Sequence, residues 1–537
     1  TPGSYLIREY AKNVEGFVAR DGGGNPLASE KINKNTWRVR TRSAAEVRVA
    51  YQVYAYELTV RTSFLDASHG YLNGASVFMY VDKMLDLPAT LTVKPYAGWT
   101  EISTSLTPAK GSKFEFDVPN YDILVDSPLE IGTHRVLTFT AAGVPHRVAM
   151  YGQANYDANR LLADMKKIAE EATTVVGEHP CKDYTFLVHN LASGGGGLEH
   201  LSSTTLQTSR TGYQYEPSYT GFLTLVAHEY FHLWNVKRIR PKALGPFDYE
   251  NENYTHLLWV AEGFTSFYED YLLRRAGLTS PDQYLNALTT EINGVENAPG
   301  NRVQSVAESS WDAWIKYYRP NENSPNTTVS YYSKGSVLGN LLNLTIMQST
   351  GGGKSLDDAM RYLWTEYHKK QQRGFTDEEF QKALEMVAGK SLAEFFQKHV
   401  FGTEPIDYNR FFNAVGLQLV DLNRGRTGPY LGVATSPAGG KLTVTSVMRG
   451  TGAYQYGLNV NDELISLDGT RLTDDINRLI AAKKVGDTVK LLVNRGGELK
   501  TLDVTIGNIP TVNYRLERVA NPTAEQTALY RKWLRLE

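Results

Sequence analysis

Hydrophobic and polar residues alternate with a period of two along the first third of the chain. Between residues 47 and 53, valine and tyrosine alternate with polar or small residues, a pattern typical of a β-strand with one buried face. Residues 72–81 and 91–99 show similar patterns, separated by turns that contain Pro and Gly. The alternation predicts an antiparallel β-sandwich over residues 1–156.

Beyond this region the hydrophobic period lengthens to that of an α-helix. Apolar residues between 161 and 169 predict an amphipathic helix, and residues 184–189 predict a short strand after it. A glycine-rich loop follows at 193–200. Helical patterns then dominate from 221 to 401, including an apolar run over 332–347.

The last quarter of the chain returns to strand patterns. Residues 430–433 and 442–447 predict strands, and residues 523–536 predict a final helix. Residues 453–469 carry the string G-L-x-x-x-D-x-L-I-x-L-D-G, which resembles a PDZ domain with the strand order of bacterial PDZ modules. This resemblance implies that the loop at 430–433 and a helix near 475–480 form the walls of a peptide groove.

We therefore expect a multidomain α+β protein. The predicted parts are an N-terminal β-sandwich (1–156), a catalytic domain (157–278), a helical domain (279–408), a PDZ domain (409–510) and a C-terminal tail (511–537). The PDZ domain could recruit a peptide or a C-terminus, or pack against the catalytic unit and limit access to it.

Composition excludes several classes of function. The 537 residues have a net charge of −2, which gives no electrostatic reason to expect nucleic acid as a partner. No apolar run is long enough for a membrane span. Cys181 is the single cysteine, so no intrachain disulfide can form. Because the sequence begins at Thr1, we expect that an N-terminal segment such as a signal peptide has been removed; a periplasmic or secreted location suits this, and a cytoplasmic one stays open.

The chemistry centres on the motif H-E-x-x-H. His228 and His232 are four residues apart, and on a helix both imidazoles would lie on one face, where they can bind one metal ion. A hydrolytic zinc site has three protein ligands and an open position for water. Glu262, in the later motif W-x-x-E-G-F, is the predicted third ligand, and His256 is its competitor. Glu269 or Asp270 could accept a hydrogen bond from the ring nitrogen of a histidine that does not bind the metal.

These residues predict a mechanism with one Zn²⁺ per chain. Zinc lowers the pKa of a bound water from about 15.7 towards 7 and polarises the scissile carbonyl. Glu229 then accepts the proton of the water and returns it to the leaving amine.

The set of motifs resembles the gluzincin aminopeptidases, which include aminopeptidase N and leukotriene A4 hydrolase. The resemblance implies a thermolysin-like α/β catalytic domain. It also gives Tyr332, in Tyr332-Ser-Lys-Gly335, the role of stabilising the transition state, with Tyr331 as its neighbour and rival. The loop Gly196-Gly197-Leu198-Glu199 resembles the substrate loop of these enzymes, in which the glutamate binds the free α-ammonium of the peptide.

Two departures from aminopeptidase N point to one branch of this clan. The interval between His232 and Glu262 is longer than in aminopeptidase N, and the stretch from His228 to Pro241 has no counterpart there. Both features, together with the C-terminal PDZ-like module, resemble the bacterial glycyl aminopeptidase family, which implies a preference for N-terminal glycine and alanine. The leading hypothesis is a zinc aminopeptidase that acts on peptides with a free N-terminus. The alternatives are a zinc endopeptidase or di/tripeptidyl exopeptidase, and a catalytically silent binding protein that acts through its PDZ domain.

Overall fold

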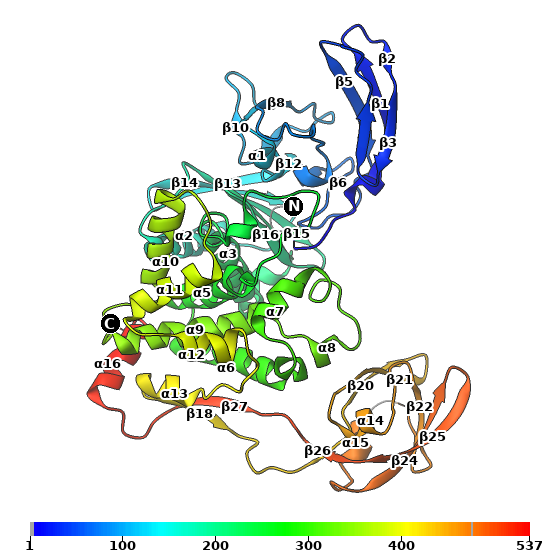
Figure 1. Ribbon diagram of the computed structural model, residues 1–537, viewed down its shortest axis with the longest axis vertical. Helices are drawn as coiled ribbons and strands as arrows, with labels where there is room; N and C mark the ends of the chain where they lie inside the picture. Colours follow the sequence, from blue (N-terminus) through cyan, green and yellow to red (C-terminus); the bar gives the residue numbers. More distant parts are fainter. Residues whose placement is uncertain (1–4, 474–475, 537) are drawn as a thin grey trace. The chain divides into compact units, whose positions relative to one another are not determined.

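The computed structural model describes residues 5–473 and 476–536. The chain forms two compact units. The first consists of Thr1–Asn253, Arg275–Leu278 and Trp364–Gly374, and the second of Tyr254–Arg274, Thr279–Leu363 and Phe375–Glu537 (Figure 1).

The first unit begins with a β-rich region, as the sequence predicts. Its strands pair in the orders β2-β1-β5, β3-β4, β6-β7-β12-β9 and β10-β11-β8. The short helix α1 (Tyr121–Val125) lies between two of these strands in the sequence. The strand bounds are β1 Val14–Asp21, β2 Pro26–Leu27, β3 Ser29–Asn33, β4 Thr36–Val39, β5 Val47–Val53, β6 Phe64–Leu65, β7 Gly70–Leu72, β8 Ala89–Thr92, β9 Glu101–Ser103, β10 Thr107–Pro108, β11 Glu115–Val118 and β12 Leu129–Gly132.

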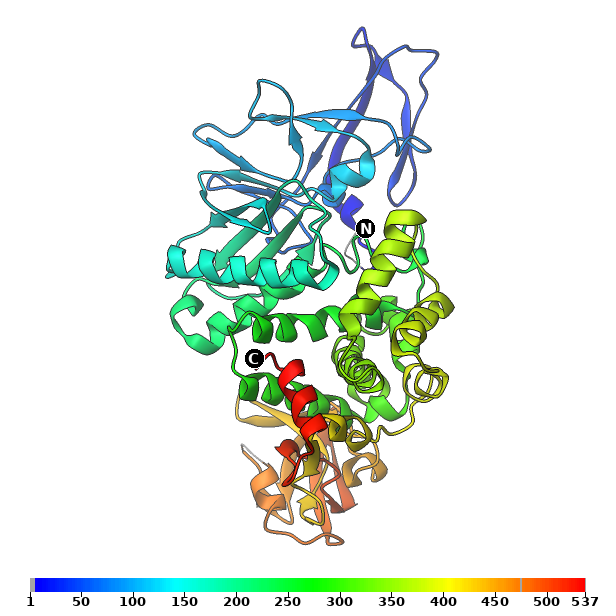
Figure 2. The same cartoon turned by 90° about the vertical axis from the view of Figure 1, so that its left-hand side faces the viewer.

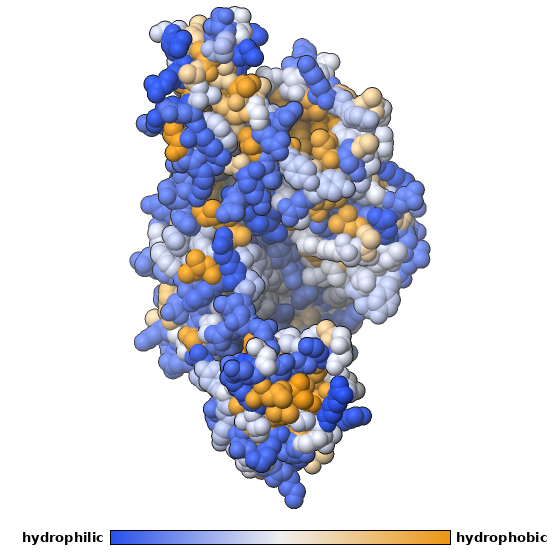
Figure 3. All heavy atoms as spheres, turned by 90° about the vertical axis from the view of Figure 1, so that its right-hand side faces the viewer, coloured by the Kyte–Doolittle hydropathy of each residue, from blue (hydrophilic) through white to orange (hydrophobic). Residues whose placement is uncertain are grey.

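Three local predictions in this region need correction. Residues 47–53 do form a strand, but the predicted buried face is wrong, because Val47 and Val49 are 37% and 44% exposed on the last strand of a small sheet. Apolar surface on these strands is visible at the top of Figure 3. Residues 72–81 and 91–99 are extended only at their beginnings, since β7 ends at Leu72 and β8 ends at Thr92.

A five-stranded sheet in the predicted catalytic domain has the order β13-β14-β15-β17-β16. Its strands are β13 Arg135–Ala141, β14 Val144–Tyr151, β15 Tyr184–Leu191, β16 Gly196–Glu199 and β17 Ser203–Ser209. Because β14 pairs with β15 in parallel, residues 135–151 belong to this sheet. The predicted domain boundary at residue 156 is therefore wrong, and the N-terminal region ends before Arg135. The predicted helix at 161–169 is part of α2 (Ala158–Val176), which packs against β13 and α3 (Glu216–Phe231) (Figure 2).

A buried carboxylate joins the N-terminal strands to this sheet. Glu130 on β12 accepts hydrogen bonds from His69 Nδ1 at 2.7 Å and from His189 Nε2 on β15 at 3.0 Å. Its side chain is fully buried. Burial raises the pKa of Glu130 to about 7, although the hydrogen bond from His69 acts in the opposite direction. Burial also lowers the pKa of His189 to about 3.

Helices fill most of the second unit before residue 413. The longest is α9, whose residues 334–347 are all buried, so this helix lies within the helical core although it also carries polar side chains such as Asn340 and Asn343. The predicted run at 332–347 lies within it. The helix bounds are α4 Leu258–Ala261, α5 Gly263–Arg275, α6 Pro281–Asn297, α7 Val306–Trp311, α8 Ser324–Thr327, α9 Tyr331–Ser349, α10 Leu356–Leu363, α11 Asp377–Ala388, α12 Ala393–Phe395 and α13 Asn409–Phe412.

The C-terminal β-module, residues 429–508, is inserted into a two-stranded ribbon. The ribbon strands β18 (Leu417–Asp421) and β27 (Tyr514–Arg518) precede and follow the module and pair with each other. The module has its own apolar core, which includes Leu442, Leu464 and Val493. Its elements are β19 Pro429–Tyr430, β20 Val433–Ala438, β21 Lys441–Val447, α14 Gly452–Gln455, β22 Glu463–Leu467, β23 Thr470–Arg471, α15 Ile476–Ile480, β24 Thr488–Arg495, β25 Glu498–Thr505 and β26 Gly507–Asn508.

One predicted wall of the peptide groove, residues 430–433, runs from the end of β19 to the start of β20. Strand β20 stands at the end of the sheet order β20-β21-β22-β24-β25, where an extended peptide can be added. The predicted helix at 475–480 corresponds to α15, and Asp475 lies outside the described residues.

Asparagine side chains attach the module and its ribbon to the helices of the second unit. Asn293 of α6 donates to the carbonyl oxygen of Tyr514 and accepts from its amide, at 3.0 and 2.7 Å. Asn297 pairs in the same way with Val512. Asn326 of α8 donates to the carbonyl oxygen of Val447 at 2.8 Å and accepts from the amide of Arg449 at 2.8 Å.

The predicted C-terminal helix is α16 (Ala524–Trp533). Trp533 and Leu534 are fully buried. Their carbonyl oxygens accept hydrogen bonds from Tyr271 Oη at 2.9 Å and Arg274 Nε at 3.0 Å, both on α5. Among all the residues that the structure describes, no helix combines the length and the apolar character that crossing a bilayer would require.

Candidate active site

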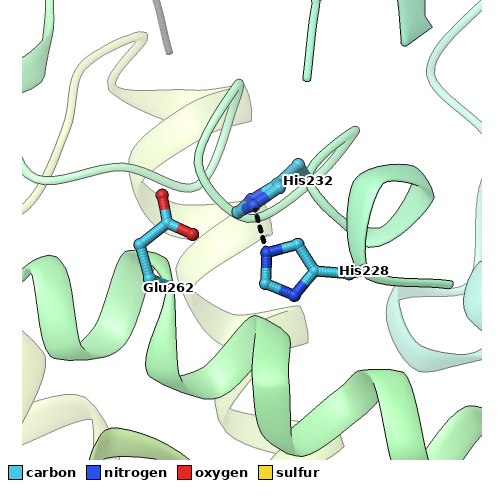
Figure 4. Close-up of side chains that lie close together, drawn as sticks. All are labelled: His228, His232 and Glu262. Carbon is cyan, nitrogen blue, oxygen red and sulfur yellow. Dashed lines mark hydrogen bonds between the residues drawn. The ribbon is translucent and has the colours of Figure 1, made fainter. Parts of the chain in front are cut away.

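The two histidines of the H-E-x-x-H motif face each other at the end of α3. His228 lies in the last turn of the helix and His232 follows its end. Their Nε2 atoms are 3.1 Å apart (Figure 4). His232 Nδ1 donates to the carbonyl oxygen of Asn235 at 2.6 Å. Because a carbonyl can only accept, this hydrogen bond leaves the lone pair of the His232 Nε2 atom for a metal ion.

Two glutamates of the first unit lie next to His232. Glu199, Glu229 and His232 each offer a ligand atom, and these atoms lie within 4.8 Å of one another. Both carboxylates are 5% exposed. The geometry thus brings together the predicted general base, the predicted ammonium-binding residue and one predicted metal ligand.

The glycine-rich segment passes directly over Glu229, the predicted general base. A Cβ atom on Gly197 would lie 2.2 Å from Glu229 Oε1, so a larger residue at this position would displace the carboxylate or the strand. The predicted loop is partly a strand: Gly196, Gly197, Leu198 and Glu199 form β16, which pairs on one side with β17 and ends the order of the five-stranded sheet. An edge strand is suited to pairing with the extended backbone of a peptide.

A buried ion-pair cluster holds the end of β16 in place. Asp126 accepts hydrogen bonds from His200 Nδ1 at 3.0 Å, from Lys237 Nζ at 2.9 Å and from the amide of Leu201 at 2.9 Å. Burial alone would raise the pKa of Asp126, but the charge of Lys237 and the hydrogen bond from His200 outweigh it and hold this pKa below its usual value. The cluster thus links the residue after Glu199 to the segment after His232.

Sequence analysis missed Asp126 and Lys237 as supporting residues. Lys237 lies five residues after the second histidine, in a segment with many basic residues that could have drawn attention to it. Asp126 has no local signal, because its partners are far away in the sequence. The same basic segment includes Arg238, which donates to Cys181 Sγ at 3.3 Å.

The back of α3 rests on buried polar residues that the sequence did not indicate either. Tyr230 Oη lies 2.8 Å from His146 Nε2 and 2.8 Å from His179 Nε2. Burial lowers the pKa of both histidines to about 4, so they are neutral at pH 7. These two histidines therefore support the helix as uncharged hydrogen-bonding groups.

In the second unit, Glu262 lies between α4 and α5 and is 3% exposed. Figure 4 shows its side chain projecting from the ribbon at this junction. Its competitor His256 has a 42% exposed side chain, stacks on Trp311 with ring centroids 4.5 Å apart, and has its Nδ1 atom 3.9 Å from Asp377 Oδ1. Glu269 and Asp270 lie further along α5. Burial and the charges of Glu269 and Glu291 raise the pKa of Asp270 to about 8.

The tyrosines at the start of α9 differ in exposure. Tyr331 is fully buried, whereas Tyr332 is half-buried. The ring of Tyr317 stacks on Tyr332 with centroids 5.6 Å apart. Burial raises the pKa of Tyr317; the hydrogen bond with Ser330 acts in the opposite direction, and the negative charge of Glu262 adds to the rise.

Three family profiles match the chain. The M61 glycyl aminopeptidase profile matches residues 221–338, the M61 N-terminal domain profile matches residues 1–133, and a PDZ domain profile matches residues 429–506. The crystal structure of an aminopeptidase N family protein from Idiomarina loihiensis is 33% identical over 99% of this chain and 93% of that chain, with a TM-score of 0.90.

The chain belongs to the M61 glycyl aminopeptidase family. As an M61 protein it is a metallo-aminopeptidase with a PDZ domain after its catalytic part. The M61 N-terminal profile ends just before β13, in agreement with the corrected domain boundary. An M1 zinc metallopeptidase from Deinococcus radiodurans is 12% identical over 73% of this chain and 86% of that chain, with a TM-score of 0.48. A comparison with curated proteins finds no match.

Proposed function

We propose that this M61 protein is a zinc-dependent aminopeptidase that removes glycine and alanine from the N-termini of peptides. One observation carries the proposal: two imidazole Nε2 atoms face each other at 3.1 Å, and the carboxylates of Glu229 and Glu199 adjoin the second histidine. In this proposal the two histidines bind the metal, Glu229 is the general base, and Glu199 binds the free N-terminus of the peptide.

The donor set fits zinc. His228 and His232 offer neutral nitrogen ligands, and the tautomer of His232 is fixed by its hydrogen bond to Asn235. We assign the third ligand to Glu262, a buried carboxylate directly before α5, rather than to His256, which stacks on Trp311. Bound zinc supplies a Lewis acid that polarises the scissile carbonyl and makes water more acidic.

The residues of the chain carry out the remaining steps. Glu229 accepts a proton from the attacking water and returns it to the leaving amine. Glu199 binds the α-ammonium of the peptide, which limits cleavage to the first residue. The backbone of residues 196–198 pairs with the peptide as an edge strand, and Tyr332 donates a hydrogen bond to the oxyanion.

The substrate preference rests on the family rather than on a pocket, because its profile is that of a glycyl aminopeptidase. An endopeptidase is less consistent with Glu199, since a buried carboxylate beside the general base favours a charged N-terminus. A di/tripeptidyl exopeptidase would place this carboxylate further from the scissile bond. A silent binding protein would not need the complete set of catalytic residues.

The test is the hydrolysis of aminoacyl p-nitroanilides, each free and N-acetylated, with and without a zinc chelator. We expect cleavage of free Gly and Ala substrates, loss of cleavage on acetylation, and recovery when zinc is restored after chelation. Cleavage of blocked peptides would instead indicate an endopeptidase, and release of dipeptides a dipeptidyl peptidase. Metal content of Glu262→Gln and His256→Gln, measured in parallel, decides the third ligand, since only the former should lose zinc.

A further inference from the structure

The hydroxyl of Tyr318 connects the two tyrosines that begin α9. Its oxygen lies 3.1 Å from Tyr332 Oη and 3.1 Å from Tyr331 Oη. Tyr318 follows the short helical segment Asp312–Trp314, and its amide donates to the carbonyl oxygen of Ala313 at 3.2 Å. The sequence analysis did not identify Tyr318, because no known motif includes it.

Either hydroxyl can be the donor between Tyr318 and Tyr332. A phenol has one proton to donate and lone pairs that accept. Tyr331 Oη donates to Tyr318 Oη, and we take the direction in which Tyr318 donates its own proton to Tyr332 Oη. The result is a chain of donors from Tyr331 through Tyr318 to Tyr332, in which each bond polarises the next.

Burial gives this chain an inner end and an outer end. Tyr331 is fully buried, and the Tyr317 ring packs against it at a tilt of 45°, with centroids 4.7 Å apart. Tyr332 is half-buried, with its ring stacked on Tyr331 at 4.9 Å. A peptide can therefore reach Tyr332 but not Tyr331.

We propose that Tyr318 is a positioning residue for catalysis, which orients the Tyr332 hydroxyl and strengthens it as a donor to the oxyanion. The proposal rests on the proposed role of Tyr332. Tyr318 does not touch the substrate in this scheme. It fixes the rotation of the Tyr332 O–H bond and donates to the Tyr332 oxygen as negative charge moves onto it.

A merely structural role predicts a different outcome on substitution. The ring of Tyr332 stacks on those of Tyr317 and Tyr331, and Tyr318 meets the Tyr317 ring edge-on at 5.3 Å. Phenylalanine at 318 keeps this ring contact and removes only the hydroxyl. If Tyr318 only packs, Tyr318→Phe should retain full activity.

The experiment is a double-mutant cycle with Tyr318→Phe, Tyr332→Phe and the combined variant, assayed on Gly-p-nitroanilide. Loss of an oxyanion donor typically costs 10²–10³ in kcat, which we expect for Tyr332→Phe. Tyr318→Phe should lower kcat about five- to tenfold, the effect of about one neutral hydrogen bond, with KM unchanged within twofold. The combined variant should be no slower than Tyr332→Phe alone, since Tyr318 acts through Tyr332.

Two further measurements separate positioning from general damage. Tyr318→Phe should weaken the binding of a phosphinic transition-state analogue by the same factor as kcat/KM, while the binding of the product glycine stays unchanged. Tyr254→Phe, which removes a hydroxyl from an exposed tyrosine stacked on Trp311, is the matched control and should keep wild-type kinetics.

The outcomes distinguish this inference from the proposed function. Full activity of Tyr318→Phe beside a slow Tyr332→Phe would overturn the inference and leave the role of Tyr332 intact. Multiplicative losses in the combined variant would also overturn it, since Tyr318 would then act independently. Full activity of Tyr332→Phe would remove the assigned role of Tyr332, and the inference with it.

Discussion

Gly263 and Gly335 pack backbone against backbone in the second unit. A Cβ atom on Gly263 would lie 2.4 Å from the Cα atom of Gly335, and one on Gly335 would lie 2.5 Å from the carbonyl oxygen of Trp259. The first glycine directly follows Glu262, and the second comes three residues after Tyr332. The glycines of the W-x-x-E-G-F and Y-x-K-G motifs thus form one helix contact, which sets the distance between the proposed third zinc ligand and the proposed oxyanion donor.

Gly335→Ala should therefore damage the site without touching a catalytic group. The added methyl group has backbone atoms as its neighbours, and such overpacking typically costs about 1–3 kcal/mol. We expect a thermal midpoint several degrees lower and a zinc affinity at least tenfold weaker, measured by calorimetry and by competition with a chelator. Gly294→Ala on α6, where the methyl group meets open space, should be neutral or stabilising. Unchanged zinc affinity in Gly335→Ala would contradict the role of this contact.

Gly197→Ala should disturb the general base. The methyl group would overlap Glu229, so either the carboxylate or β16 must move, and a small displacement of a catalytic group can cost about 10²-fold. We expect kcat for Gly-p-nitroanilide to fall by about that factor while the zinc content stays near one per chain. Gly195→Ala, whose methyl group would have ordinary contacts, is the control and should retain activity.

Glu199→Gln should change recognition of the N-terminus. The amide is nearly isosteric but carries no charge, so the contact with an ammonium group weakens while the hydrogen bonds of β16 are kept. KM for Gly-Gly-Gly should rise at least about tenfold, with a smaller change in kcat. Equal KM values for variant and wild type would rule out Glu199 as the ammonium ligand.

The C-terminal β-module should be removable. Leu422 and Asn513 already face each other at the end of the ribbon, where the amide of Leu422 donates to the carbonyl oxygen of Asn513 at 2.8 Å. Replacing residues 423–512 by Asn-Gly, a favoured two-residue hairpin turn, should leave a folded aminopeptidase with wild-type kcat on aminoacyl anilides. A shorter variant that stays folded but loses this activity would show that the PDZ domain takes part in catalysis on small substrates.

The free energy of unfolding should depend on pH through the protonation of Glu130. Its pKa is about 7 when folded, above its usual 4.5, so the folded state binds this proton more tightly than the unfolded chain does. Protonated Glu130 therefore adds about 3 kcal/mol to the free energy of unfolding below pH 4.5, and this contribution is lost as the pH rises to 7. Glu130→Gln should flatten urea unfolding free energies over this range, whereas Glu30→Gln at an exposed carboxylate should not. An unchanged slope in Glu130→Gln would contradict this assignment.

Local motifs explain why much of the candidate site could be predicted. His228, Glu229 and His232 lie within one and a half helical turns, so their spacing alone brings the histidines together. The supporting residues could not be found in this way: Asp126 is 74 residues from His200 and 111 from Lys237. In the fold, the alternating pattern correctly predicted strand β5. It could not predict that this strand is exposed, because burial depends on whether another sheet covers the strand. Strands β13 and β14 alternate like those before them, and only their pairing with β15 shows where they belong.

The hydrogen bonds between α5 and the end of α16 have a consequence for synthesis. Tyr271 and Arg274 bind carbonyl oxygens of residues 533 and 534, which leave the ribosome after the whole PDZ domain. Until then, the helix that begins directly after Glu262 lacks its last packing partner. The packing around this helix is therefore completed only after the PDZ domain has been synthesised.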